Sequence, residues 1–253
     1  MTKMENSIVE HAASHLKRND MDFFKRVWNA PSEQYLNRLN AIDFKNKNCV
    51  LDAGFGMGQW TLPYAQLNTE LFGIEFSEDR VEAVRKLVES SGLKNMNIQQ
   101  GDIENLPYED NKFDAIFCYS VVFLVDYRKA LREFYRVLKP GGKVYFTANG
   151  LGWYLFCMFE NHNKSESYDP RSMGVEAIKN TIQGLAGGGF ELGKQIIIDQ
   201  AALTLELKNI GFADIRIGHE GELVVGQNKK ASSFYSNQEY LGQPMVYECI
   251  STK

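Results

Sequence analysis

Short apolar runs alternate with amphipathic stretches over residues 46–149. The apolar runs are rich in β-branched and aromatic side chains, as buried strands are. The stretches between them carry apolar residues three and four positions apart, which is the spacing of one helix face. In the clearest case that face consists of Val81, Val84, Leu87 and Val88. The pattern therefore predicts strands that alternate with helices.

Seven strands are expected, and capping residues bound the helices between them. The strands cover residues 49–51, 71–74, 96–100, 113–119, 143–148, 212–217 and 244–251. The helices with the clearest patterns begin near Trp60, Ser77, Asp126 and Asp199. Serine and aspartate side chains accept hydrogen bonds from the free amides of a first helical turn, whereas glycine and proline end helices. Three of these helices should end before Gly92, Pro140 and Gly211.

This alternation indicates a doubly wound α/β fold. A strand, a helix and a further strand form a right-handed crossover, so the strands lie parallel and helices cover both faces of the sheet. The last two strands have no long helix between them, which predicts an antiparallel strand at one edge. We therefore expect a single domain over residues 1–253, built on a mostly parallel seven-stranded sheet. Its parts are a helical N-terminal cap (1–45), a core (46–149), an insertion (150–196) and a C-terminal helix with strands (197–253).

The composition is that of an ordinary soluble globular protein, with 44% hydrophobic and 24% charged residues. The formal net charge of −4 gives no general attraction to phosphate backbones or anionic membranes, so nucleic acid is disfavoured as a partner. The longest apolar run, residues 151–159, is too short to span a bilayer as a helix. The first residues show no signal-peptide core. We expect a cytoplasmic protein without a membrane span, and no pattern indicates an oligomeric state.

Cysteine and histidine positions argue against a disulfide scaffold or a metal site. The four cysteines lie far apart and form no C-x-x-C pair, so free thiols in a reducing compartment are expected. His11 and His15 lie four residues apart, but no obvious further ligand accompanies them. We therefore expect no bound metal.

Residues suited to ligand chemistry follow the first three strands. In a doubly wound sheet, ligands bind at the carboxyl ends of the strands, where the strand order reverses. The first strand leads into a glycine turn at residues 52–58 (DAGFGMG), where bare backbone can approach a ligand at a helix start. Glu75 ends the second strand about twenty residues later, where a carboxylate can accept both hydroxyls of a ribose. Asp102 follows the third strand.

The spacing of the glycines separates the candidate ligands. A dinucleotide-binding turn has the pattern G-x-G-x-x-G, and Gln59 stands at the last glycine position here. No Gly-Lys-Ser or Gly-Lys-Thr follows the turn, which excludes a P-loop. Asp52 would repel a pyrophosphate, but a carboxylate suits a ligand that carries an ammonium and a sulfonium group. These residues favour a cationic adenosine ligand.

The same segments resemble the class I S-adenosylmethionine-dependent methyltransferases, in particular the subgroup that methylates small molecules. The likeness runs through residues 50–58 (VLDAGFGMG), 73–77 (GIEFS), 101–103 with 106–107, 113–116 (FDAI) and 131–142 (LREFYRVLKPGG). It covers residues 46–149 well and residues 196–253 more loosely. The resemblance implies a Rossmann-like methyltransferase fold and S-adenosyl-L-methionine as the cofactor.

The resemblance also implies roles for the residues of the glycine turn. The backbone around Gly54, Gly56 and Gly58 would hold the amino acid end of the cofactor. Asp52 would lie nearby and act partly through water.

Further roles follow for residues at the ends of the later strands. Glu75 would bind the ribose hydroxyls, and Phe76 would cover one face of the adenine. Asp102 would accept a hydrogen bond from the exocyclic amine, and the Ile103 amide would meet a ring nitrogen. Tyr119 would border the site of methyl transfer.

Acceptor specificity is expected from segments outside the core. These are the N-terminal helices and the insertion, which leaves the sheet at the carboxyl end of the fifth strand. The insertion opens with aromatic residues and later has five glycines in residues 184–193. This composition is consistent with a lid over the active site. Core aromatics beside an ordinary glycine loop would account for it equally well.

Methyl transfer to a hydroxyl needs a general base, whereas an amine acceptor needs only to be neutral. His162 is the candidate base, because it is the only histidine in the insertion. Its neighbours are polar, so a solvated surface histidine is the competing interpretation. Asp169, Tyr154 and a mechanism without a base are the alternatives.

The predicted function is methyl transfer to a small-molecule or sugar-like acceptor at a hydroxyl. N-methylation of a small amine is one alternative, and a cofactor-binding regulatory protein without catalysis is another. A nucleic-acid methyltransferase is disfavoured by the charge balance and because no Asn/Asp-Pro-Pro-Tyr/Phe motif follows the fourth strand. A nicotinamide-dependent oxidoreductase does not fit the glycine spacing.

Overall fold

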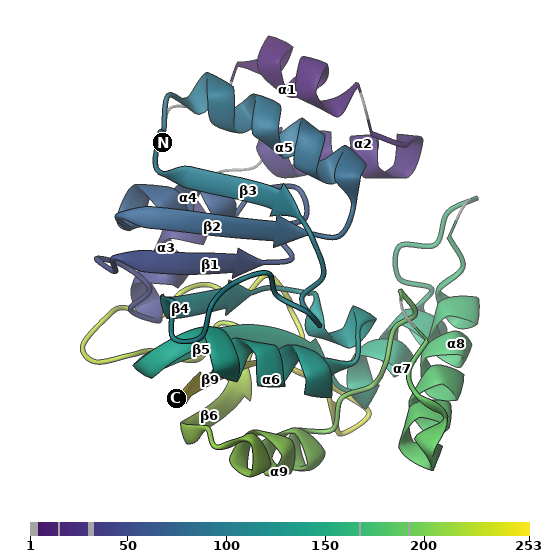
Figure 1. The fold of residues 1–253 in the computed structure, drawn as a ribbon. Coiled ribbons are helices and arrows are strands. Elements are labelled where there is room, and N and C mark those ends of the chain that lie inside the picture. Colours follow the sequence, from purple (N-terminus) through teal and green to yellow (C-terminus); the bar gives the residue numbers. More distant parts are fainter. Residues whose placement is uncertain (1–4, 15, 30–32, 167, 192) are drawn as a thin grey trace.

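Seven strands form one central sheet in the computed structural model of the chain, which describes residues 5–14, 16–29, 33–166, 168–191 and 193–253 (Figure 1). The strands are β1 (Cys49–Ala53), β2 (Glu70–Glu75), β3 (Met96–Gln100), β4 (Phe113–Cys118), β5 (Leu138–Asn149), β6 (Ala213–His219) and β9 (Val246–Thr252). Their order across the sheet is β3-β2-β1-β4-β5-β9-β6. A separate hairpin pairs β7 (Glu239–Tyr240) with β8 (Gln243–Pro244). The strand order reverses beside β1, so the sheet is doubly wound, as the sequence predicts.

All strands of this sheet run parallel except β9. β1 pairs in parallel with β2 and with β4, so that Leu51 lies opposite Phe72 on one side and Ile116 on the other. β9 pairs antiparallel with both β5 and β6. The expected antiparallel strand is therefore present, but it lies one place in from the edge, and β6 takes the edge. The physical reason is the crossover after β5, which carries the chain past one strand position that β9 then fills.

The capping residues place the helices where the sequence predicts them. The helices are α1 (Asn6–Ala13), α2 (Arg18–Asn29), α3 (Glu33–Ala41), α4 (Thr61–Leu67), α5 (Glu78–Ser91), α6 (Tyr127–Val137), α7 (Leu151–Glu160), α8 (Pro170–Gln183) and α9 (Gln200–Ile210). A 3₁₀ turn (Val122–Leu124) and a π turn (Gly184–Gly188) occur as well. Ser77, Asp126 and Asp199 each accept a hydrogen bond from a backbone amide in the first turn of α5, α6 and α9. Gly92 and Gly211 follow α5 and α9 in the left-handed conformation, with φ of 72° and 116°.

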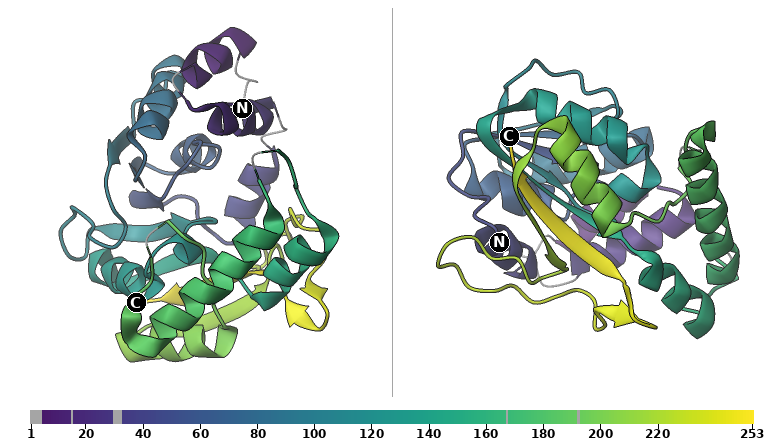
Figure 2. Two further views of the ribbon diagram at one scale, coloured as in Figure 1. Left: turned by 90° about the vertical axis from the view of Figure 1, so that its right-hand side faces the viewer. Right: turned by 90° about the horizontal axis from the view of Figure 1, so that it is seen from below.

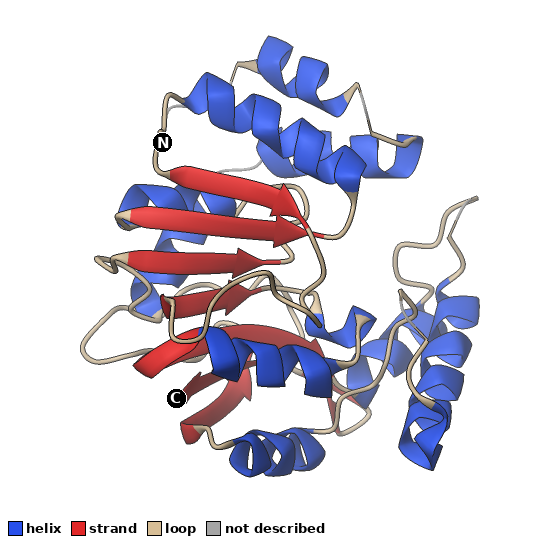
Figure 3. Ribbon diagram, viewed as in Figure 1, coloured by secondary structure: helices blue, strands red, loops and turns tan. Residues whose placement is uncertain are grey.

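Helices cover both faces of the sheet (Figure 3). In Figure 1, α6 and α9 lie in front of the sheet, and α3 and α4 lie behind it. In front, Leu131 and Phe134 of α6 share a buried cluster with Phe146 of β5. Behind, Leu39 of α3 and Tyr64 of α4 belong to a second buried cluster. Burial of a side chain of this size contributes about 1.5–3 kcal/mol, so the two clusters hold the strand ends firmly in place.

The insertion forms helices rather than a loop. Helices α7 and α8 pack against each other, and Figure 2 shows the pair projecting beyond the carboxyl end of the sheet. The glycine-rich segment begins with the π turn, which continues α8 and changes direction at Gly187, whose φ is 87°. At the other end of the chain, α1 packs against α5.

β5 begins earlier than the sequence predicts. The ladder with β4 pairs Leu138 with Phe113, skips the Pro-Gly-Gly segment and resumes at Lys143. Gly141, in the skipped segment, donates a backbone hydrogen bond of 2.8 Å to the carbonyl of Lys253. The Pro-Gly-Gly segment thus ends α6 as expected, but it does so as a bulge inside the strand.

The cysteines are free thiols. Cys118, Cys157 and Cys249 are buried and Cys49 is half-buried. Within the described part of the chain, no group of three or more His, Cys, Asp or Glu side chains could hold a metal ion. His15, which the sequence places four residues after His11, lies outside the described residues. None of the described helices is long and apolar enough to cross a membrane.

Candidate active site

A cavity of about 890 Å³ lies at the carboxyl ends of β1, β2, β3 and β4. All of the predicted cofactor residues except Gly58 line it. Other parts of the wall come from α2, from α3 and from the loop before β7. The parallel strands therefore bring together at one place the side chains that the sequence places at four separate strand ends.

The turn after β1 is tight because its glycines take left-handed conformations. Gly54, Gly56 and Gly58 have φ of 76°, 54° and 77°. A Cβ on Gly54 would lie 2.6 Å from Val121, and one on Gly58 would lie 2.8 Å from Val84 of α5. A Cβ on Gly56 would meet nothing within 4 Å. Gly58 therefore allows the turn to pack closely against α5, whereas the backbone of Gly54 and Gly56 lines the cavity.

The two cavity-lining glycines provide a matched pair of substitutions. We expect Gly56→Ala to lower the free energy of unfolding by about 1–2 kcal/mol, which is the cost of left-handed backbone for alanine. Gly54→Ala carries the same cost and also displaces Val121, so a further loss of about 1–3 kcal/mol is expected. Urea unfolding of both variants measures the difference. Equal losses would contradict the close packing of Gly54 on Val121.

Asp52 is a buried carboxylate that lines the cavity without a cationic partner. Its side chain is 2% exposed, and Oδ2 accepts a hydrogen bond of 2.8 Å from the Thr61 hydroxyl. Burial raises the pKa of Asp52 to about 7; the Thr61 hydrogen bond lowers it and the charge of Glu75 raises it, each by less. None of the described Lys, Arg or His side chains is among the groups that shift it. A cationic ligand group would therefore meet no competing cation here.

Glu75 connects the glycine turn with the helices above it. Its Oε2 accepts a hydrogen bond of 3.0 Å from the Gly56 amide, and its Oε1 accepts one of 3.1 Å from the Ser77 amide. Arg80 of α5 lies 3.7 Å from Oε1 and forms a bidentate pair with Asp20 of α2, at 2.9 and 3.1 Å. The carboxylate is 6% exposed and lines the cavity. It is thus held rigidly before any ligand binds.

The ends of β2 and β3 supply three more of the predicted residues. The Phe76 side chain lines the cavity and is 63% exposed, which is unusual for a large apolar residue. Asp102 accepts a hydrogen bond of 2.8 Å from the Glu104 amide, which orients its carboxylate. Ile103 is buried in the front cluster. An exposed ring and a fixed carboxylate in one cavity can bind a planar base by stacking and hydrogen bonding.

Five aromatic residues form another part of the cavity wall, here named the aromatic cluster: Tyr35, Trp60, Tyr119, Phe234 and Tyr235. The Trp60 ring centroid lies 4.8 Å from those of both Tyr35 and Tyr119. Tyr35 and Phe234 stack at 5.7 Å. These residues come from α3, the start of α4, the end of β4 and the loop before β7. Tyr119 is the one member that the sequence predicts as a site residue.

Three hydroxyl groups meet at the aromatic cluster. Ser120 has a φ of 60°, which non-glycine residues rarely adopt and which is common at functional sites. Its amide donates a hydrogen bond of 2.8 Å to the Thr147 hydroxyl. The side chains of Ser120 and Tyr119 hydrogen-bond with that of Tyr235 and lower its pKa, but burial raises that pKa by more. The strained turn thus places polar groups against an apolar wall.

Comparison with known proteins shows which family the residues around this site are similar to. Residues 51–146 match the family described as methyltransferase domain. The matched segment contains the glycine turn and the ends of β2, β3 and β4, which supply most of the cavity wall. This match supports the expected class I S-adenosylmethionine-dependent methyltransferase family over residues 51–146. It also supports S-adenosyl-L-methionine as the cofactor, and the solved structures confirm the expected Rossmann-like fold.

Two curated bacterial relatives are similar to part of this chain. The uncharacterised methyltransferase YcgJ of Bacillus subtilis is 38% identical over 106 residues, which are 42% of this chain and 42% of that protein. A demethylmenaquinone methyltransferase of Bacillus mycoides is 34% identical over 110 residues, 42% of this chain and 46% of that protein. The match spans less than half the length of either relative. A solved structure of an S-adenosylmethionine-dependent methyltransferase from Thermotoga maritima aligns with 98% of this chain and with 99% of its own chain. The TM-score is 0.55 and the sequence identity is 20%, so this likeness shows the shared fold.

A buried charged group of residues, here named the Arg38 cluster, contacts the aromatic cluster. It consists of Arg38, Tyr145, Glu220 and Glu248. Nη1 of Arg38 lies 2.6 Å from Oε1 of Glu220 and 2.9 Å from Oε2 of Glu248. The Tyr145 hydroxyl donates a hydrogen bond of 2.7 Å to Glu248. The Tyr119 hydroxyl donates one of 3.0 Å to Glu220, so a residue of the cavity wall is bonded directly to the buried charges.

His162 is not among the residues that line this cavity. Its ring packs against Trp153 and Phe156 of α7, with centroids 5.4 and 5.0 Å apart. Trp153 in turn contacts Tyr235 at 5.4 Å, so one aromatic ring separates His162 from the wall. Of the described residues of the insertion, Gly193 alone lines the cavity. The structure therefore brings the predicted cofactor residues together but does not bring His162 to them.

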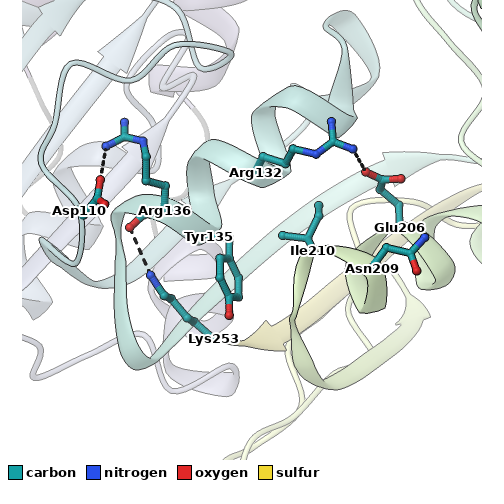
Figure 4. Close-up of a pocket in the computed structure, with 8 residues that line it drawn as sticks. All are labelled: Asp110, Arg132, Tyr135, Arg136, Glu206, Asn209, Ile210 and Lys253. Atoms are coloured by element: carbon teal, nitrogen blue, oxygen red, sulfur yellow. Dashed lines mark hydrogen bonds and ion pairs between the residues drawn. The ribbon is translucent and has the colours of Figure 1, made fainter.

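A second cavity, of about 510 Å³, lies between α6, α9 and the C-terminal residue (Figure 4). Its cationic side chains are paired with their neighbours. Arg132 lies 2.6 Å from Glu206, Arg136 lies 2.9 Å from Asp110, and Lys253 donates to the Arg136 carbonyl at 3.3 Å. None of the predicted site residues lines it. The first cavity is therefore the candidate active site.

Proposed function

We propose that this protein transfers the methyl group of S-adenosylmethionine to a small-molecule acceptor at a hydroxyl group. The observation that supports the proposal is a single cavity with two different walls, one of polar strand ends and one of aromatic rings that carry hydroxyl groups. When bound, the cofactor supplies a methyl group that is already activated on a sulfonium sulfur. The protein then has mainly to hold two molecules in register, and such positioning can contribute about 7–11 kcal/mol.

In this proposal the glycine turn binds the charged end of the cofactor. Asp52 is a buried carboxylate without a cation, so it fits an ammonium or sulfonium group better than any other residue of the wall. Gly54 and Gly56 let that group approach the backbone, because no Cβ stands in the way.

The adenosine end of the cofactor would lie along the ends of β2 and β3. Glu75 is held by two backbone amides and would accept the ribose hydroxyls. The exposed Phe76 ring would cover the adenine, and Asp102 with the Ile103 amide would bind its edge. The three side chains line the same cavity as Asp52, which supports one continuous ligand.

The acceptor would lie against the aromatic cluster. Its rings favour a flat or largely apolar molecule, since such a molecule gains most from contact with aromatic faces. The hydroxyl groups of Tyr119, Ser120 and Tyr235 can orient a hydroxyl on that molecule. The relatives named demethylmenaquinone methyltransferases support a small-molecule acceptor.

Calorimetric titration with S-adenosylmethionine, S-adenosylhomocysteine and NAD tests the proposal. We expect micromolar binding of the two sulfur compounds and no response to NAD. A screen with labelled methyl groups should then find transfer to hydroxyl compounds such as phenols and sugars. Amine compounds in the same screen test N-methylation as the alternative.

Each outcome of this experiment separates one reading from the others. A folded protein that binds neither sulfur compound, even with candidate acceptors present, would refute the proposed function. Binding without transfer to any acceptor would favour a regulatory protein of the same fold. Transfer to amines alone would keep the enzyme but change its acceptor class.

We expect the Asp20–Arg80 ion pair to slow dissociation of the cofactor. It ties α2, which carries part of the cavity wall, to α5 beside Glu75. Both side chains are about one third exposed, so the pair contributes about 0.2–1 kcal/mol. We expect Asp20→Asn to speed dissociation of S-adenosylhomocysteine about 2- to 5-fold, measured by stopped-flow displacement. Asp22→Asn, which removes the same charge from an exposed position of α2, is the control and should leave the rate unchanged.

A further inference from the structure

The Arg38 cluster contains two carboxylates and one guanidinium, so its formal charges do not balance. Arg38 and Glu248 are fully buried and Glu220 is 2% exposed. A buried charge without compensation costs several kcal/mol. One carboxylate can balance Arg38, so the other is the group of the cluster that can take up a proton.

Both carboxylates accept several hydrogen bonds. Glu220 accepts from Ser233 at 2.7 Å, from the Phe234 amide at 2.9 Å and from Tyr119 at 3.0 Å, and it forms an ion pair with Arg38. These donors suit an ionised carboxylate, which can only accept. Glu248 accepts from Arg38 at 2.9 Å, from Tyr145 at 2.7 Å and from the Leu223 amide at 2.6 Å. Arg38 thus donates a hydrogen bond to Glu248 and can be balanced by it, which leaves Glu220 as the carboxylate that can take up a proton.

A single hydroxyl group, that of Tyr119, links Glu220 to the cavity by a hydrogen bond. Tyr119 lines the cavity, and its Oη donates to Oε1 of Glu220 at 3.0 Å. Burial raises the pKa of Tyr119 well above its usual value, so the phenol keeps its proton at neutral pH. A neutral phenol that donates to a carboxylate still has lone pairs with which it can accept from a second hydroxyl.

We propose that Tyr119 and Glu220 form a proton relay that takes the hydroxyl proton of the acceptor during methyl transfer. This inference rests on the proposed function and gives the reaction its base. Tyr119 would be the catalytic residue in contact with the acceptor, and Glu220 a positioning residue that acts through it. The relay would fill the role that the sequence suggests for His162.

The proposed step balances in bonds and in charge. The acceptor oxygen forms a bond to the methyl carbon, and the carbon–sulfur bond breaks with its electron pair remaining on sulfur. The acceptor proton moves to Oη of Tyr119 as the Tyr119 proton moves to Oε1 of Glu220. One positive charge on sulfur and one negative charge on Glu220 disappear together, so no net charge is created in the buried site. The proton returns through Tyr119 to water after the product leaves.

Several titratable and charged groups face Glu220. They come from α3, the end of β4, β5, the loop before β7, and β9: Arg38, Tyr119, Tyr145, Tyr235 and Glu248. The tyrosines stay protonated because burial raises the pKa of each. The proton that the relay gains therefore remains on a carboxylate.

Two acceptors of different acidity separate a relay from a structural role. Phenol must lose its proton during transfer, whereas 4-nitrophenol is far more acidic and is largely ionised without help. We expect Glu220→Gln to lower kcat with phenol by about 10²- to 10⁴-fold, which is the usual contribution of general acid–base catalysis. The loss with 4-nitrophenol should be less than about tenfold. Tyr119→Phe should show the same contrast without any change of charge.

The pH profile and two measurements without turnover complete the test. With phenol, kcat of the wild type should level off as the pH rises, whereas that of Glu220→Gln should climb about tenfold per pH unit, because the acceptor must then ionise by itself. Calorimetry should show S-adenosylhomocysteine binding within twofold of the wild type, and urea unfolding should show folded variants. Tyr145→Phe removes a hydroxyl that binds Glu248 rather than Glu220, so it should lose stability but keep kcat and the pH profile.

Equal losses with both phenols, or a Glu220→Gln variant with wild-type kcat and pH profile, would overturn the relay. Transfer confined to amines, or to neither phenol by a protein that binds the cofactor, would overturn it as well. Each of these results leaves the cofactor site standing. Failure of the wild type to bind S-adenosylhomocysteine is the distinct result that refutes the proposed function itself.

Discussion

Glu75→Ala is expected to weaken the binding of S-adenosylhomocysteine by at least about 10²-fold, because hydrogen bonds to a charged group contribute about 1.5–3 kcal/mol each and the ribose offers two hydroxyls. The variant also removes the acceptor of the Gly56 and Ser77 amides, so the turn itself becomes less ordered. Calorimetry measures the dissociation constant directly. Glu75→Gln keeps the shape of the side chain but not its charge. Its dissociation constant should lie between those of the wild type and Glu75→Ala.

Glu78→Ala is the matched control for this prediction. Glu78 lies three residues further along, is exposed and is not part of the cavity wall, yet its removal changes the net charge equally. Its dissociation constant should stay within about twofold of the wild type, as for other exposed positions. Similar weakening in both variants would show a general electrostatic effect and would remove Glu75 from the ribose-binding role.

Asp52→Asn is expected to stabilise the ligand-free protein above neutral pH while it weakens cofactor binding. The pKa of Asp52 is about 7 in the folded protein, against a reference value of 3.8. Between these values the folded state holds a proton that the unfolded state has released. Stability therefore falls as the pH rises from about 4 to about 7, by roughly 4 kcal/mol in total. Asparagine cannot ionise, so the variant escapes this loss.

Binding of the cofactor should favour the ionised form of Asp52 and so offset the loss of stability at higher pH. A ligand with positive groups beside Asp52 favours the ionised carboxylate, so the affinity for S-adenosylmethionine should rise with pH up to about 7 and then level off. In Asp52→Asn the affinity should be lower and should lack this rise. Urea unfolding and calorimetry at several pH values measure both effects. A wild type and variant with parallel stability–pH curves would show that Asp52 is ionised in the ligand-free protein.

The polar wall of the cavity was predictable from the sequence because the signals for its residues are local. Asp52, the three turn glycines and Glu75 follow apolar runs at fixed spacing, and a parallel sheet brings strand ends together whatever the rest of the chain does. The caps Ser77, Asp126 and Asp199 are equally local, because each binds an amide within its own first turn. Their places follow from neighbours only a few residues away.

The acceptor side was less predictable because it depends on distant partners. Arg38 lies in a polar amphipathic stretch and its sequence context suggests a solvated residue, yet it is fully buried beside a carboxylate 210 residues away. Phe234 and Tyr235 stand in an irregular polar segment, where two adjacent aromatic residues were the one available signal. The choice of His162 as a base rested on residue type, whereas the hydrogen bonds of Tyr119 and Glu220 are visible only in three dimensions.

The position of β9 inside the sheet has a consequence for the order in which the protein is assembled. β6 is made before β9, but among the described strands it pairs with β9 and not with β5. While the chain is being synthesised, β6 must therefore wait beside an unfilled gap, with its hydrogen-bonding edge open to association with other chains. The strand that closes the gap also carries Glu248 and completes the Arg38 cluster. The polar wall of the cavity, which comes from the ends of β1 to β4, can therefore form before the strand that completes the Arg38 cluster has been synthesised.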